Sequence, residues 1–275
     1  MGRFRKLETL KDYQRALKNK FGLGYVDEYM PWLRVQDVNS AGNSGKIDGI
    51  KSNRVHHTLS EQESCFFYLA EFCDPVIDIR EQFPLLPLDL SVKIAKTLDV
   101  DHPINPVTKD KVLNVMTTDF LLTLTDGTNT WYEAISVKPA DDLKDKRTAE
   151  KLDIERVWWQ LQGIAFHIFS MTEQTQIQSR NIQWFTSPYR QGSNFQNDTI
   201  EKAKSIVKLG TNLIEDLCND FIRELNVEHV DALVLLKVLL ATKQVCVDLN
   251  KPIAESGILQ VVKVARQVGE QQNAS

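Results

Sequence analysis

The stretch "TTDFLLTLTDGTNTWYEAISVKPA", residues 117–140, decides the fold of this chain. Two apolar runs flank Asp126-Gly127, a dipeptide typical of tight hairpin turns, so the stretch predicts two antiparallel strands. The first run begins with an acid, Asp119, and the second ends in Lys138. Because both lie far from the turn, the hairpin brings an acid and a lysine to the same end.

The register of the hairpin determines which side chain lies opposite Asp119. If Leu124 faces Glu133, this acid faces Lys138. A shift of two residues places it opposite Ser136 instead. One explanation for the pair is a cross-strand ion pair, worth about 0.2–1 kcal/mol. The other is a functional site, which requires a second acid from another element.

The whole chain has 275 residues, which predicts one large or two medium domains. Its apolar fraction of 42% is enough to fill a core. It has no apolar run long enough to span a bilayer, and the initial "MGRFRK" lacks the apolar stretch of a signal peptide. The four cysteines form no C-x-x-C motif, which argues against a zinc site or a disulfide framework. We therefore expect a soluble, cytoplasmic protein.

The charge is unevenly distributed. A net charge of −4 argues weakly against tight, unaided binding to nucleic acid. The first twenty residues are nevertheless rich in lysine and arginine. This basic arm is either a polyanion contact or the solvated face of an amphipathic helix.

The order of expected elements over the first 170 residues is α-β-β-β-α-β. Turn residues mark 38–54 as a loop or hairpin, and residues 88–114 read as an insertion with a short helix near 91–97. The hydrophobic patterns predict a helix over 8–20, then a core made of a helix over 60–73, a strand over 76–83, the hairpin, a helix over 147–162 and a buried strand over 164–170.

A second domain is expected after a junction near residue 171, where the hydrophobic pattern weakens. We therefore divide the chain into a first domain over 1–170 and an interaction domain over 171–275. The second domain carries helical patterns followed by two short strands, which favours a mostly helical, winged-helix-like module. These patterns lie at 199–208, 211–225 and 228–240 for the helices and at 243–250 and 258–265 for the strands.

Glu63 is the candidate second acid. In "SEQE" it stands three residues after Ser60, so it also fits a capping box in which its carboxylate reaches back to the Ser60 amide. The combination of a helical glutamate, a strand acid and a strand ending in x-Lys, in α-β-β-β-α-β order, favours a functional site.

This combination resembles the PD-(D/E)xK nuclease superfamily, which has the restriction-endonuclease-like fold. Within it, the chain resembles the TnsA endonuclease subunits of heteromeric Tn7-like transposases. The likeness is spread over most of the first 170 residues, and the last hundred match more loosely. It is carried by "MPWLRVQDV", "NRVHHTLSEQE", "DIREQFPLLPLD", "VMTTDFLL", "SVKPADDLKDKRTAEKL" and "ERVWWQ".

The resemblance implies Glu63 and Asp119 as metal-binding carboxylates and Lys138 as the active-site lysine. The family has an acid or amide two residues before the lysine, where this chain has Ser136. One interpretation is that Glu63, Asp119, the Val137 carbonyl and water hold the metal, with the Ser136 hydroxyl on a bound water.

The other interpretation of this departure is a weakened site, or one completed by a different acid. Three glutamates are near enough in sequence to be considered for that place: Glu133, Glu150 and Glu155.

The implied chemistry is Mg²⁺-dependent hydrolysis of a DNA phosphodiester, with Mn²⁺ as a substitute metal. The metal activates water and relieves charge on the phosphate, and the lysine stabilises developing negative charge. By resemblance, the substrate is transposon-end DNA, and the partners are the integrase-like transposase TnsB and the AAA+ regulator TnsC.

Further residues are candidates for DNA contacts. Arg80 and Gln82 share a face of the expected strand and either position phosphate or lie on a surface strand. His57, Lys46 and Arg54 are candidates for the DNA backbone. The pair His56-His57 points to opposite faces of a strand, which argues against a joint metal site and leaves a structural role open.

The sequence favours structural roles for one glutamate and for a pair of tryptophans. Glu81 has the parity of an apolar face and needs a partner there, so it is either paired structurally, which we favour, or near the metal. Trp158 and Trp159 are expected to pack in the core or at an interface.

Two other functions stay open from the sequence. The first is a non-catalytic or weakly catalytic assembly subunit that bridges transposase and regulator, which the Ser136 departure favours. The second is a freestanding restriction or repair nuclease, against which the specificity of the matched motifs argues.

Overall fold

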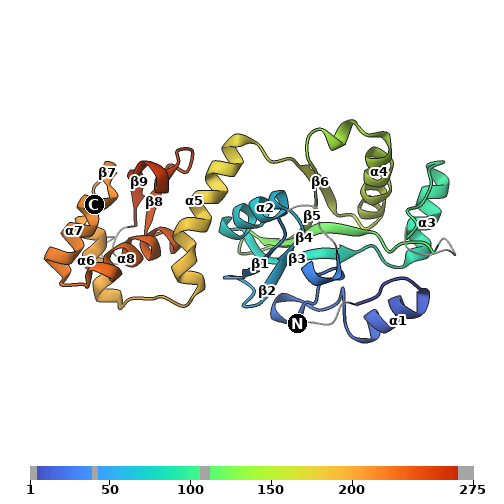
Figure 1. Ribbon diagram of the computed structural model, residues 1–275, viewed down its shortest axis with the longest axis horizontal. Coiled ribbons are helices and arrows are strands. Elements are labelled where there is room, and N and C mark those ends of the chain that lie inside the picture. The colour runs from blue at the N-terminus through green and yellow to red at the C-terminus, as the bar shows by residue number, and fades with distance from the viewer. Residues whose placement is uncertain (1–4, 39–42, 106–111, 266–275) are drawn as a thin grey trace. The chain divides into compact units, whose positions relative to one another are not determined.

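The structure is a computed structural model that describes residues 5–38, 43–105 and 112–265. The chain divides into two compact units, one ending at Thr172 and the other beginning at Glu173 (Figure 1). Within the described residues, no helix is long and apolar enough to cross a membrane.

The first unit is built on a four-stranded sheet of order β3-β4-β5-β6. β3 is antiparallel to β4, and β4 is antiparallel to β5. After the crossover through α4, β6 runs parallel to β5. The strands are β3 (Val76–Pro84), β4 (Thr117–Thr125), β5 (Thr130–Val137) and β6 (Ala165–Phe169).

The hairpin forms as predicted, but its register corrects one expectation. Leu121 pairs with Ala134 and Leu124 pairs with Trp131. Leu124 therefore does not face Glu133, and the register that places Asp119 opposite Lys138 is wrong. The alternative, shifted by two residues, is confirmed, because the Ser136 hydroxyl donates to Asp119 at 3.2 Å.

Two helices cover the sheet on opposite faces, as Figure 1 shows. The Phe66 ring of α2 (Glu61–Phe72) lies 5.1 Å from Phe120. Trp158 and Trp159 of α4 (Lys146–Leu161) share a core cluster with Leu121. Because neighbouring residues of a strand point to opposite sides, these contacts place α2 and α4 on different faces. The predicted order α-β-β-β-α-β and the packing role of the two tryptophans are confirmed.

β6 is an edge strand, which corrects its predicted burial. It pairs only with β5 within the described sheet, and Ile168 is 45% exposed. The sequence "IAFHIFS" is as apolar as a central strand, but the chain has no further described strand to cover its outer edge.

The remaining elements of the first unit surround this core. The segment predicted as a loop or hairpin forms a two-stranded antiparallel ribbon, and the predicted short helix of the insertion starts three residues earlier than expected. These elements are α1 (Leu10–Lys18), η1 (Val26–Glu28), η2 (Val35–Asp37), β1 (Gly45–Asp48), β2 (Val55–Thr58), α3 (Leu88–Thr97) and η3 (Asp142–Lys144). Arg3, at the start of the basic arm, lies outside the described residues.

The second unit contains five helices and three strands among its described residues. Its sheet has the order β7-β9-β8 and is antiparallel. The elements are α5 (Glu173–Arg190), α6 (Asn197–Ile206), β7 (Gly210–Leu213), α7 (Ile214–Leu225), α8 (His229–Ala241), β8 (Val245–Val247), α9 (Ile253–Ser256) and β9 (Ile258–Val264). Two expectations are corrected: the weak pattern after residue 171 is a long helix, and residues 211–213 are a strand rather than helix.

Helix α8 is the apolar centre of this unit. It packs against α5 and α7, and most of its leucines are buried. The element order α6-β7-α7-α8-β8-β9 suits the predicted winged-helix module, which stays a prediction.

Candidate active site

Asp119 lies near the start of β4, where its carboxylate is surrounded by donors from the end of β5. Its Oδ2 accepts the Val137 backbone N–H at 2.6 Å and the Lys138 ammonium at 2.8 Å. The Ser136 hydroxyl donates to the same oxygen at 3.2 Å. The hairpin therefore fixes one carboxylate oxygen of Asp119 and leaves Oδ1 for other ligands.

Lys138 follows β5 directly and is held by its backbone as well as by its charge. Its N–H donates to Phe169 O at 2.9 Å, and its carbonyl accepts the Ser170 hydroxyl at 2.8 Å. Its ammonium also donates to Val137 O at 2.9 Å. Burial lowers the pKa of Lys138, but the carboxylates of Asp119, Glu155 and Glu63 together outweigh burial and raise the pKa above its usual value. The lysine is a fixed cation at the end of the sheet.

Glu63 occupies the first turn of α2, where it takes part in the helix cap. Its backbone N–H donates to the Ser60 hydroxyl at 3.1 Å, as a capping box requires. Its carboxylate accepts the Leu59 amide at 2.9 Å, rather than the Ser60 amide that we predicted. Burial and the charge of Asp119 raise the pKa of Glu63 to about 7. The carboxylate of Glu63 is thus part of both the helix cap and the acid site.

Gln82 joins the two acids. Its Nε2 donates to Glu63 Oε2 at 3.3 Å and to Asp119 Oδ1 at 3.5 Å. Its Oε1 accepts the Thr117 hydroxyl at 2.9 Å. The structure therefore brings Glu63, Asp119 and Lys138 together, as predicted, with an amide between the carboxylates.

Glu155 is the one of the three alternative acids that lies beside this cluster. It is fully enclosed on α4, and burial followed by the charge of Asp119 raises its pKa to about 8. The hydroxyls of Thr118 and Ser136 favour its charged form but do not offset burial. Its Oε1 has no hydrogen-bond partner among the described residues.

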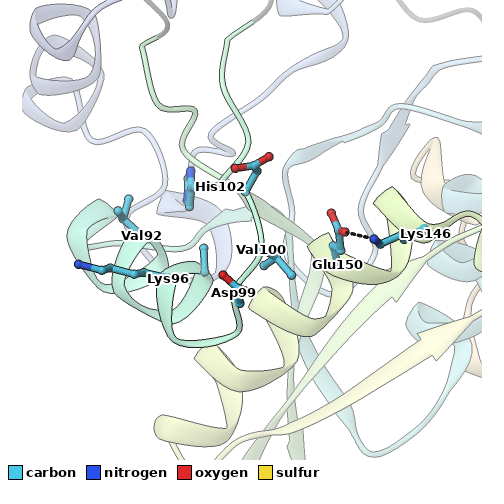
Figure 2. Close-up of a pocket in the computed structure, with 9 residues that line it drawn as sticks. Val92, Lys96, Asp99, Val100, His102, Lys146 and Glu150 are labelled. Atoms are coloured by element: carbon cyan, nitrogen blue, oxygen red, sulfur yellow. Dashed lines mark ion pairs between the residues drawn. The ribbon is translucent and has the colours of Figure 1, made fainter.

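The other two alternative acids are engaged elsewhere. Glu133 lies 3.8 Å from His167 and accepts the Trp131 indole N–H at 3.0 Å. Glu150 pairs with Arg147 at 2.8 Å. Figure 2 shows Glu150 paired also with Lys146 at the rim of a pocket of about 520 Å³ between α3 and α4. That pocket mixes acids and lysines, so it does not form a positive phosphate site.

The protein atoms that could bind a metal at the acid site are oxygens, and hard cations prefer oxygen ligands. Mg²⁺ is held through one or two carboxylates and keeps several waters. Glu63, Asp119 and the Val137 carbonyl meet that requirement, and the unpaired Glu155 Oε1 lies nearby. No group of three or more His, Cys, Asp or Glu among the described residues is arranged to hold a metal. The donor set fits Mg²⁺ but is sparse in carboxylates.

Arg80 and Gln82 do not act together on one strand face. The Gln82 backbone has a φ of 48°, which interrupts the alternation of β3. Arg80 lies over the rings of Tyr25, Phe83 and Tyr132 and is 3.5 Å from Asp78. A phosphate contact by either residue stays a prediction.

Arg54 is a buried structural residue, which corrects its prediction as a DNA contact. Its guanidinium forms two hydrogen bonds with Glu81, at 2.8 and 2.6 Å, and its side chain is 8% exposed. His56 bonds the same carboxylate at 2.9 Å. Glu81 therefore has structural partners, which is the interpretation that we favoured from its place on the apolar face of the strand.

His57 and Lys46 lie on the β1–β2 ribbon, paired with each other in register. His57 is half-buried, and burial lowers its pKa, whereas His56 is buried. The two histidines point to opposite sides, as predicted. Lys46 is exposed, and its contact with DNA stays a prediction.

The αβββαβ core with two carboxylates and a lysine gathered at one end of the sheet defines a nuclease-like domain of the restriction-endonuclease class. Residues 73–171 match the family model described as TnsA-like endonuclease N terminal. The chain is 43% identical over 173 residues to the transposon Tn7 transposition protein TnsA of Escherichia coli. These matches make residues 73–171 similar to the N-terminal endonuclease domain of TnsA-like proteins. The match covers 63% of this chain and 61% of that relative.

Proposed function

We propose that this protein is a Mg²⁺-dependent DNA endonuclease subunit of a heteromeric transposase, which cuts the 5′ ends of a transposon. The observation that carries the proposal is the ion pair of 2.8 Å between Lys138 Nζ and Asp119 Oδ2, with Glu63 linked to the same aspartate through Gln82. The relation to a Tn7 transposition protein supports the transposon end as the substrate.

The reaction is hydrolysis of a phosphodiester. A water oxygen forms the new bond to phosphorus, the bond from phosphorus to the 3′ oxygen breaks, and that oxygen leaves with a proton. When bound, Mg²⁺ would activate the water and neutralise charge on the phosphate. Glu63, Asp119 and the Val137 carbonyl would hold it.

Lys138 supplies a fixed positive charge beside the reacting phosphate. It is aligned by Asp119 and Val137, so it needs little rearrangement to stabilise negative charge that develops in the transition state. The Val137 N–H holds Asp119 Oδ2, which keeps the other oxygen of this carboxylate aimed at Glu63 and Gln82.

The partners of the proposed subunit are an integrase-like transposase of the TnsB type, which processes the 3′ ends, and an AAA+ regulator of the TnsC type. A net charge of −4 suits a nuclease that partners deliver to DNA. We assign the contact with this regulator to the second unit.

A cleavage assay on transposon-end DNA tests the proposal, with the partner transposase and Mg²⁺ present. We expect 5′-end cutting by the wild type and a loss of at least about a hundredfold in Asp119→Ala and in Lys138→Ala. Equal cutting by all three proteins would remove the catalytic assignment.

The second candidate function is a non-catalytic assembly subunit. The sparse set of carboxylates around Ser136 favours it. In that case the wild type would cut nothing in the same assay but would still promote assembly of the transposase with its regulator.

A further inference from the structure

Gln82 occupies an unusual place in the acid site. It is 2% exposed, and its side chain lies between the two carboxylates proposed to bind metal. Its backbone is in the left-handed region, with a φ of 48°, although it is not a glycine. Such a conformation costs of order 1–3 kcal/mol and persists where the surroundings hold it. The fold thus maintains a strained backbone that directs an amide at Glu63 and Asp119.

The amide has the chemistry of a reversible ligand. With Nε2 toward the acids, it donates to both and offsets their mutual repulsion. Turned over by 180°, the same group presents Oε1 to them, and amide oxygens are ordinary ligands of hard cations. Its other partner permits this change, because the Thr117 hydroxyl now donates to Oε1 and can equally accept from an N–H.

The two distances from the Gln82 amide to the carboxylates suit a shared cation. Neighbouring ligands of an octahedral Mg²⁺, each about 2.1 Å from the metal, are about 3 Å apart. The amide terminus lies 3.3 Å from Glu63 Oε2 and 3.5 Å from Asp119 Oδ1. The Ser136 side chain does not fill the same role here, because its short hydroxyl donates to the other oxygen of Asp119.

We propose that Gln82 is a metal ligand of this site through its side-chain oxygen, and that it supplies the third protein side chain that Ser136 does not. In the metal-free protein the same amide holds Glu63 and Asp119 in place with its N–H groups. This inference rests on the proposed function, since it concerns the same metal.

Mn²⁺ titration of the full-length protein tests the inference, with free Mn²⁺ measured by electron paramagnetic resonance. The variant Gln82→Met keeps the length of the side chain and removes its oxygen. We expect its Mn²⁺ affinity to fall about tenfold to a hundredfold, as for loss of a metal-supporting group. Gln160→Met, at an exposed glutamine of α4, is the matched control and should bind like the wild type.

Gln82→Glu provides a second measurement that does not depend on how well the methionine variant folds. It keeps an oxygen ligand and adds a charge, so Mn²⁺ should raise its melting temperature more than that of the wild type. An unchanged Mn²⁺ affinity in Gln82→Met, or a smaller Mn²⁺-induced rise in Gln82→Glu, would overturn the inference.

Asp119→Asn separates failure of the inference from failure of the proposed function. If Asp119→Asn abolishes Mn²⁺ binding and Gln82→Met does not affect it, the site is a metal site and only the role of Gln82 is wrong. If Asp119→Asn also binds Mn²⁺ like the wild type, the metal site itself is misplaced.

Discussion

The indole N–H of Trp159 donates to the hydroxyl of Thr118 at 2.7 Å, and both side chains are fully enclosed. This bond ties α4 to the residue that precedes Asp119 in β4. The position of the acid is therefore set from both sides, by the hairpin partner strand and by the helix across the sheet.

Trp159→Phe should destabilise the protein by about 1–3 kcal/mol, because it leaves the buried Thr118 hydroxyl without its donor. It should also slow cleavage, since the strand beside Asp119 loses an anchor. Urea unfolding measures the first effect. Trp131→Phe, at an exposed tryptophan of the hairpin, is the control and should cost less than about 0.5 kcal/mol. Equal midpoints for the two variants would contradict the prediction.

Arg54→Met should cost about 3–5 kcal/mol, because it leaves the carboxylate of Glu81 charged and without its main partner in a buried site. The double variant Arg54→Met/Glu81→Gln should recover much of that loss. Unfolding free energies of both proteins provide the check. If the single variant unfolds like the wild type and instead weakens DNA binding, Arg54 is a DNA contact after all.

The stability of the first unit should fall in acid through Glu81. Burial raises the pKa of this group, but His56 and Arg54 outweigh burial and hold the pKa well below its usual value of 4.5. A lowered folded pKa means that the stabilisation is present above pH 4.5 and is lost as the pH falls below it. Unfolding midpoints at pH 7 and at pH 3 should therefore differ less in Glu81→Gln than in the wild type. The same difference in both proteins would exclude Glu81 as the source.

Ser136→Asp tests the departure from the family pattern. The new carboxylate would lie beside Asp119 and Glu155, so the metal-free protein should lose about 1–3 kcal/mol of stability through repulsion between like charges. Mn²⁺ should restore that loss, and its affinity should rise about tenfold. Calorimetric melting with and without Mn²⁺ measures both effects. A variant that Mn²⁺ does not stabilise would show that position 136 does not face the metal.

The core of the fold could be predicted because Asp126-Gly127 separates two apolar runs and because the stretch from Ser60 to Glu63 marks the start of a helix. The register of the hairpin could not be predicted from the sequence. Both registers keep the same residues on each face, since they differ by two positions, and the choice depends on contacts such as that between Ser136 and Asp119.

The long helix α5 escaped prediction because its buried face mixes polar residues with apolar ones. Asn181 donates to the carbonyls of Leu249 and Lys251 and accepts the Ile253 N–H. Such a helix shows little hydrophobic period, and the proline at position 188 adds a signal that argues against helix.

The acid site was predicted in outline and missed in detail. Glu63, Asp119 and Lys138 were assigned through the resemblance to the nuclease family, and the structure brings them together. Glu155 was one of three open choices. Gln82 was placed with Arg80 because strand alternation was assumed to hold across it. A left-handed backbone at a glutamine leaves no sign in the sequence, whereas at a glycine it would.

The edge strand β6 gives the site a weak point. Phe169, the last residue of β6, receives the backbone N–H of Lys138, whereas Asp119 lies on a strand paired on both sides. Edge strands open at lower free energy than central ones. Partial fraying of β6 would therefore remove a backbone anchor of Lys138 while Asp119 stays paired, so the lysine would loosen before global unfolding.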